Sequence, residues 1–169
     1  QGRRRTGETP ELPDKMHLQA SNVPLKKIVD ENIELLGSIQ NKHVNMINRV
    51  PETTIGYADS NTINLVIRNL ITNAIKFTND GGEIVVAAEE KGKEIVMSVK
   101  DNGIGMTADI QKKLFDKVNP YSTRGTANEK GTGLGLILCK EFVEKNGGRI
   151  WVEGNVDKGS TFWFTLPKA

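Results

Sequence analysis

Cysteine is almost absent from this sequence: Cys139 is the single one among 169 residues. One thiol excludes an internal disulfide framework and a zinc site built from several cysteines. Such scarcity is typical of a reducing compartment, so we expect a cytoplasmic location.

Aromatic residues are also scarce, and the positive and negative charges are nearly balanced. Aromatics make up 5% of the chain, and the formal net charge is +2. The charge balance provides no basic surface for nucleic acid, and few aromatic rings are available to stack on bases. The composition therefore excludes a nucleic-acid partner.

No apolar run is long enough to span a bilayer or to serve as a secretion signal. We expect a soluble piece without direct membrane contact, which leaves open an inner-membrane anchor elsewhere in a longer parent chain.

The length and the 37% apolar content suit one core. Residues 1–15 carry glycine, proline and charges without periodicity and read as a linker, so the predicted domain covers residues 16–169.

Helical and strand periodicities alternate along this domain and predict an α+β fold. The loop at 116–130 has no apolar period, and we expect it to be a mobile lid. Helices are predicted at 24–41, 59–77 with Asp59 as N-cap, a short segment after Thr107, and 134–145; strands are predicted at 44–47 and 54–57, with hairpins at 83–89/94–100 and 149–153/161–166.

The helix predicted at 59–77 carries three polar residues on one face. Asn69, Asn73 and Lys76 lie within about 60° of one another around the helix axis. An asparagine oxygen can complete the coordination of Mg²⁺ when phosphates supply the charge, and a lysine can contact phosphate. The alternative is an ordinary solvated helix face.

A second motif follows the first hairpin, in the run Asp101-Asn-Gly103-Ile-Gly105. A carboxylate there can accept a hydrogen bond from an exocyclic amine such as adenine N6, and glycines let the backbone approach a flat ligand. The alternative is an ordinary turn at the exit of a strand.

Two other nucleotide motifs can be rejected. Residues 103–108 match G-x-G-x-x-A, but the preceding strand belongs to a hairpin instead of a βαβ unit, and no acidic residue follows at the required distance. A G-x-x-x-x-G-K-[ST] loop does not occur.

A third motif, Gly131-Thr132-Gly133-Leu134-Gly135-Leu, precedes the helix predicted at 134–145. Its amides and the helix N-terminus can meet a triphosphate, and the same glycines also suit a hinge for the lid. Arg124 and Lys130 in the lid are candidate phosphate contacts, with simple solvation as the alternative.

Taken in this order, the motifs resemble those of the catalytic, ATP-binding domain of bacterial sensor histidine kinases, within the superfamily of gyrase, heat-shock chaperone, histidine kinase and mismatch-repair ATPases. The resemblance covers roughly residues 16–167. The matching segments are Asn69-Leu-Ile-Thr-Asn73-Ala-Ile-Lys76-Phe77-Thr (N box), Asp101-Asn-Gly-Ile-Gly-Met106 (G1 box), Leu114-Phe115 (F box), Gly131-Thr-Gly-Leu-Gly-Leu (G2 box) and Gly159-Ser-Thr161-Phe-Trp-Phe-Thr-Leu-Pro (closing strand).

The resemblance implies the family's two-layer α/β sandwich, the Bergerat ATP-binding fold. A mixed, mostly antiparallel sheet would be covered on one face by three helices, with a mobile ATP lid. It also implies ATP and Mg²⁺ as cofactors. The implied roles are Asn73 as Mg²⁺ ligand, Asn69 as its support and Lys76 as a phosphate contact, all three catalytic; Asp101 as the adenine carboxylate; Phe77, Gly103, Gly105 and Met106 around the base; Gly131, Thr132, Gly133, Leu134 and Gly135 beside the phosphates; and Thr161 in the adenine network.

The implied activity is that of a protein-histidine kinase in two-component signal transduction, which transfers the γ-phosphoryl group of Mg-ATP to a histidine. That histidine would lie on a dimerisation domain of the same or the partner protomer, with a response regulator downstream. The isolated domain is expected to be monomeric and the parent kinase homodimeric. The rival hypotheses are a nucleotide-binding interaction module without transfer and a protein-serine kinase of the anti-sigma type.

The sequence departs from the family pattern in two respects. No helical hairpin bearing an acceptor histidine precedes the domain, and neither His17 nor His43 has the expected context. The second F-box aromatic is replaced by Val118. Residues 1–13 resemble the tail that leaves a dimerisation domain, so we expect the acceptor histidine on another part of a longer kinase.

Overall fold

The computed structural model describes residues 18–40, 42–115, 135–154 and 156–169. Helices and strands are mixed along these residues, as the sequence predicts. The helices are α1 (Leu25–Ile39), α2 (Ser60–Phe77), α3 (Ala108–Lys113) and α4 (Gly135–Lys145), and the strands are β1 (Ala20–Pro24), β2 (Asn45–Asn48), β3 (Ile55–Asp59), β4 (Glu83–Lys91), β5 (Glu94–Asp101), β6 (Ile150–Gly154) and β7 (Ser160–Pro167).

Helix α2 begins where the sequence places its cap. The Asp59 side chain accepts a 2.9 Å hydrogen bond from the Thr62 amide, which satisfies one of the free donors of the first turn. Burial of the Asp59 carboxyl raises its pKa, but bonds from the Gln19 and Thr62 amides outweigh burial, so the pKa is lowered overall. The helix is therefore fixed at a defined starting residue.

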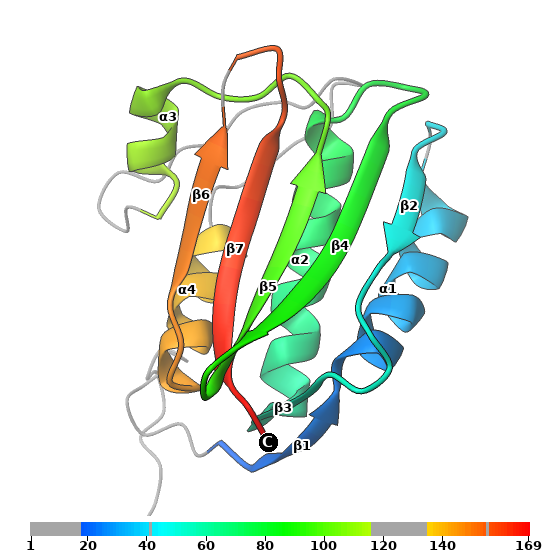
Figure 1. Cartoon of the computed structure of the whole chain (residues 1–169). Coiled ribbons are helices and arrows are strands. Elements are labelled where there is room, and N and C mark those ends of the chain that lie inside the picture. Colours follow the sequence, from blue (N-terminus) through cyan, green and yellow to red (C-terminus); the bar gives the residue numbers. More distant parts are fainter. Residues whose placement is uncertain (1–17, 41, 116–134, 155) are drawn as a thin grey trace, which may run out of the picture.

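The larger sheet has five strands in the order β2-β4-β5-β7-β6, and its strands run antiparallel except for the parallel pair β2 and β4. Helices α1, α2 and α4 lie across one face of this sheet (Figure 1). This arrangement confirms the predicted sandwich of three helices on a mixed, mostly antiparallel sheet. The short helix α3 lies beyond the edge strand β6 (Figure 1).

The core fills the space between the two layers. Alternate residues of β7, Phe162, Phe164 and Leu166, are buried against the helices. The apolar stripe of α2, which includes Ile63, Ile67, Leu70 and Ile71, faces them and is fully buried. Removal of this apolar surface from water is the main stabilising contribution to the fold.

Two elements differ from the sequence prediction. The first helix begins at Leu25 because Pro24 has an extended backbone and ends β1. Strand β1, which we did not predict, pairs antiparallel with β3 in a separate two-stranded sheet. Four of its five residues are exposed, so it carries no periodic apolar signal.

The predicted glycine stop after α4 is confirmed. Gly147 has a φ of 87°, and the Gly148 amide donates to the Val143 carbonyl at 2.9 Å. Such a left-handed residue reverses the chain and satisfies a carbonyl of the last helical turn. In the described part of the chain, no helix has both the length and the hydropathy required to cross a membrane.

Candidate nucleotide-binding site

The polar face of α2 meets the beginning of α4. Asn69, Asn73 and Lys76 are half-buried on this helix, so their side chains are neither core nor fully solvated. A Cβ added to Gly135 would lie 3.4 Å from Asn69 Oδ1. The last glycine of the third motif, which is also the first residue of α4, therefore lies directly beside the first asparagine of the N box.

Cys139, one turn into α4, also contacts this face. Its thiol is fully buried, and burial raises its pKa to about 12, although a hydrogen bond with the Asn69 side chain opposes this effect. Asn69 therefore lies at the contact between α2 and α4.

The carboxylate of Asp101 lies at the end of β5 and is almost fully buried, with 3% of the residue exposed. Its Oδ1 accepts a 2.9 Å hydrogen bond from the Gly103 amide. Burial raises the pKa of Asp101 above the ordinary value of 3.8, and the amides of Gly103 and Ser160 partly oppose this shift. A buried carboxylate that has no cation beside it among the described residues costs stability, which makes Asp101 a candidate for ligand binding.

The G1 segment packs directly on the end of α2. The Ile104 amide donates to the Phe77 carbonyl at 3.1 Å, and a Cβ on Gly103 would lie only 1.9 Å from that carbonyl oxygen. No other residue type fits at position 103 without a backbone shift. The N-box and G1 segments therefore converge, although 24 positions separate Phe77 from Asp101.

Ser160 lies opposite Asp101 in the register of β5 with β7, whereas Thr161 lies opposite Lys100. Directly opposed residues project from the same face of a sheet, and successive residues alternate. Ser160 is 4% exposed and shares the face of Asp101. The structure does not bring Thr161 to that face; Ser160, which we did not predict, takes the place beside the carboxylate.

Three further residues of the predicted site, Gly105, Met106 and Phe77, lie within the described part of the chain. Gly105 has a φ of 71°, which suits glycine at this bend of the G1 segment. Met106 is 6% exposed and belongs to the core, so its side chain anchors the G1 segment to the core. Phe77 is half-buried, and the Lys76 ammonium lies 5.0 Å from the centre of its ring.

The rest of the predicted site lies outside the described residues. This group comprises Arg124, Lys130, Gly131, Thr132, Gly133 and Leu134, together with Val118 and the predicted lid. The predicted linker at residues 1–15 also lies outside them.

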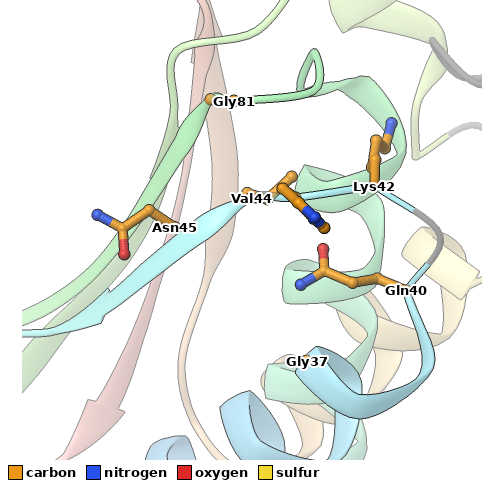
Figure 2. Close-up of a pocket in the computed structure, with 8 residues that line it drawn as sticks. Gly37, Gln40, Lys42, Val44, Asn45 and Gly81 are labelled. Atoms are coloured by element: carbon orange, nitrogen blue, oxygen red, sulfur yellow. The ribbon is translucent and has the colours of Figure 1, made fainter.

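A separate pocket of about 510 Å³ lies between the end of α1 and the beginning of β2, and Gly37, Gln40, Lys42 and Asn45 are among its lining residues (Figure 2). None of the predicted site residues lines it. Across the described ranges, no group of three or more histidine, cysteine, aspartate or glutamate side chains is arranged to hold a metal ion.

Comparison with known proteins agrees with this geometry. Residues 58–169 match the family model for histidine kinase-, DNA gyrase B- and HSP90-like ATPases. The adaptive-response sensory kinase SasA of Crocosphaera subtropica is 37% identical over 144 residues, which are 84% of this chain and 36% of SasA. The sensor protein SrrB of Staphylococcus aureus is 30% identical over 166 residues, or 94% of this chain and 28% of SrrB.

Solved structures show the same relationship. The catalytic domain of histidine kinase ThkA superposes with a TM-score of 0.76 at 28% identity, covering 89% of this chain and 97% of that domain. ThkA in complex with the response regulator TrrA matches with a TM-score of 0.73 at 27% identity, over 90% of this chain and 42% of the ThkA chain.

The chain thus spans about a third of its curated relatives, while it corresponds to nearly the whole of an isolated kinase catalytic domain. The family model covers more than half of the chain, including α2, the G1 segment and the closing strand. The chain belongs to the histidine kinase-, DNA gyrase B- and HSP90-like ATPase family, and within it to the catalytic domains of sensor histidine kinases.

Proposed function

We propose that this domain binds Mg-ATP and transfers its γ-phosphoryl group to a histidine on a separate dimerisation domain. The observation that carries the proposal is the buried Asp101 carboxylate, held against the end of α2 by the Gly103 contact. Because burial of this carboxylate is costly, a ligand with a matching donor accounts for it best.

Adenine is the base that this site suits. The Gly103 amide uses Asp101 Oδ1, and a carboxylate retains further acceptor positions for an exocyclic amine. Guanine carries a carbonyl where adenine carries that amine, so the carboxylate repels it. Gly103 and Gly105 would form the wall beside the base, Phe77 would border it, and Ser160 adds a hydroxyl beside the carboxylate.

The donor set on α2 fits Mg²⁺ bound together with phosphates. Mg²⁺ takes few protein ligands and prefers oxygen, so one amide plus phosphates and water is sufficient. We assign Asn73 as the ligand and Asn69, which lies beside the start of α4, as its support. When bound, Mg²⁺ neutralises phosphate charge, and Lys76 would add a second cation.

Transfer depends mainly on position. Phosphoryl transfer requires in-line placement and charge neutralisation more than covalent help from the protein. Asn69 carries a neutral amide, which cannot accept a proton from water as a carboxylate does. The isolated domain should therefore hydrolyse ATP slowly and retain it for the imidazole of the acceptor.

The proposed partners are the histidine-bearing dimerisation domain of the same or the partner protomer and a downstream response regulator. The likeness to ThkA, which was solved with the response regulator TrrA, supports this assignment. A cytoplasmic location agrees with the use of ATP. The parent kinase would be a homodimer and the isolated domain a monomer.

The test is to mix this chain with a separately produced acceptor domain and γ-labelled ATP. An acid-labile phosphohistidine supports the proposal. An acid-stable phosphoester would instead indicate a serine kinase, and no label would indicate a binding module without transfer.

Asn73→Ala tests the metal assignment in a parallel titration with ATP and Mg²⁺. This variant should lose Mg²⁺-dependent ATP affinity by at least about tenfold, because a charge-assisted contact is removed. Thr72→Ala, at the adjacent exposed position of the same helix, is the matched control and should bind as the wild type does. An unchanged affinity in Asn73→Ala would remove Asn73 from the metal site.

A further inference from the structure

The end of α2 has more backbone carbonyls than its own cap can satisfy. The last four carbonyls of an α-helix have no partner within the helix. Thr78, the residue after α2, satisfies two of them: its hydroxyl donates to the Ala74 carbonyl at 2.6 Å, and its amide donates to the Ile75 carbonyl at 3.2 Å. The carbonyls of Lys76 and Phe77 take their bonds from other parts of the chain.

Each of these two bonds comes from a different segment. The Phe77 carbonyl accepts from the Ile104 amide of the G1 segment. The Lys76 carbonyl accepts from the Lys42 ammonium at 3.2 Å. Lys42 belongs to the connection between α1 and β2, 34 positions earlier in the chain, and is only 8% exposed. A cation at this position also interacts favourably with the negative end of the helix dipole.

The connection that carries Lys42 is itself fixed to the turn after α2. The His43 amide donates to the Asp80 carboxylate at 2.6 Å, and the Gly81 amide donates to the His43 carbonyl at 2.6 Å. The backbone of Lys42 is thus held beside the helix end, and its side chain reaches back to the last turn.

Side-chain packing alone does not fix this connection. The pocket of about 510 Å³ lies against it, and Gln40 Oε1, on the pocket wall, is buried without a hydrogen-bond partner in the described residues. In Figure 2 the Lys42 side chain points away from the Gln40 amide. With a hollow on one side, polar bonds such as that of Lys42 hold the connection to α2.

We infer that Lys42 is a positioning residue for the phosphate side of the nucleotide site, acting through the last turn of α2. Its ammonium holds the backbone of Lys76, and so sets where the Lys76 side chain is directed. This inference rests on the proposed function, because it assumes that Lys76 contacts a phosphate. No substrate contact is assigned to Lys42 itself.

The test is the affinity for Mg-ATP, measured by calorimetry on the whole chain. Lys42→Met retains the apolar stem but removes the donor. It should weaken binding about tenfold, because a displaced Lys76 would lose its charged contact with the phosphate. Lys42→Arg retains a cationic donor and should restore most of the affinity. Lys26→Met removes a lysine of α1 whose ion pair with Asp30 is partly exposed, and should bind as the wild type does.

A double-mutant cycle separates positioning from a general structural role. If Lys42 acts through Lys76, Lys42→Met should cost little further affinity in a Lys76→Met background, because the side chain that it positions is already gone. Additive losses, or wild-type affinity in Lys42→Met, would overturn the inference. If Lys42→Met does not fold, Lys42→Gln, whose amide ends short of the Lys76 carbonyl, replaces it in the cycle. Failure of the wild-type chain to bind Mg-ATP would instead contradict the proposed function.

Discussion

Asp101 shows at the residue scale how stability and binding oppose each other. The carboxylate is buried at the end of β5, and its bonds to the Gly103 and Ser160 amides only partly offset the cost of burial. A protein under selection for stability alone would place a neutral side chain there. The cost of burying Asp101 is therefore measurable, and it provides a test of the proposed binding role.

Asp101→Asn should weaken ATP binding and increase the stability of the fold. The Asn oxygen can still accept the two amide bonds, while its NH₂ group opposes the exocyclic amine of adenine and attracts a carbonyl. We expect ATP affinity to fall at least about tenfold, and affinity for GTP relative to ATP to rise. Calorimetric titration with both nucleotides measures this change. An unchanged ATP affinity would remove Asp101 from the base-binding role.

The raised pKa of Asp101 also predicts how stability depends on pH, and the same variant tests this prediction. Because the pKa of Asp101 is raised on folding, the folded wild type binds a proton more tightly than the unfolded chain, and stability falls as the pH rises from 3.8 through the raised pKa. At neutral pH, Asp101→Asn should therefore be at least as stable as the wild type in urea unfolding. Its advantage should shrink as the pH approaches 3.8. If the stability of the variant relative to the wild type were lower at neutral pH than near pH 3.8, the raised pKa of Asp101 would be contradicted.

Cys139 gives a second prediction for a single residue. With a pKa of about 12 and no exposed surface, its thiol is protonated and shielded at neutral pH. An aromatic disulfide reagent should leave the native chain unmodified and label one thiol per chain after denaturation. Labelling of the native chain at the rate of a free thiol would show that the contact between α2 and α4 opens readily.

At this scale, sequence patterns identify Asp101 and the asparagines but not the neighbours of the carboxylate. Whether Ser160 or Thr161 faces Asp101 depends on the register between β5 and β7, and a shift of one residue reverses the choice. The register is set by packing across the whole sheet, so no local pattern at positions 160 and 161 specifies it.

At the scale of elements, the carboxyl end of α2 is the junction at which the segments of the candidate site meet. It receives the G1 segment through Ile104 and the α1–β2 connection through Lys42. The first contact needs glycine at position 103, where there is no space for a side chain. Small changes at this junction should therefore affect binding as well as stability.

Gly103→Ala tests the junction. Its Cβ would lie 1.9 Å from the Phe77 carbonyl oxygen, so the G1 segment must move away from α2. We expect a loss of about 1–3 kcal/mol in the free energy of unfolding, as for other overpacked sites, and weaker ATP binding. Gly37→Ala is the matched control, since its Cβ would meet only the end of the Met46 side chain at 3.6 Å. It should be neutral or stabilising, because alanine favours a helix over glycine. Equal effects of the two substitutions would contradict the close approach at Gly103.

The elements differ in how well the sequence specifies them. Helix α2 combines an N-cap, a long apolar stripe and a polar end, so several local signals agree on it. Strand β1 is short, exposed and paired with a distant segment, and only the folded chain brings its partner β3 beside it. Its position follows from tertiary structure and not from its own residues.

At the scale of the whole molecule, the sheet order brings together motifs that are distant in sequence. The central place of β5, between β4 and β7, puts Asp101 opposite Ser160 on one side and next to the end of α2. The order of motifs along the chain predicts the family and the sandwich. The crossing of β7 to a place beside β5, which completes the surroundings of Asp101, required the structure.

The central claim is that these segments surround one purine triphosphate with its Mg²⁺. The most direct measurement is a titration of the isotope-labelled chain with ATP and Mg²⁺, following the backbone amide shifts by NMR. The account predicts saturable shifts in three segments, at residues 69–77, 101–106 and 135–139, that require Mg²⁺ for full size and are much weaker with GTP. Shifts confined to the pocket around Gly37 and Asn45, or no saturation by ATP, would contradict it.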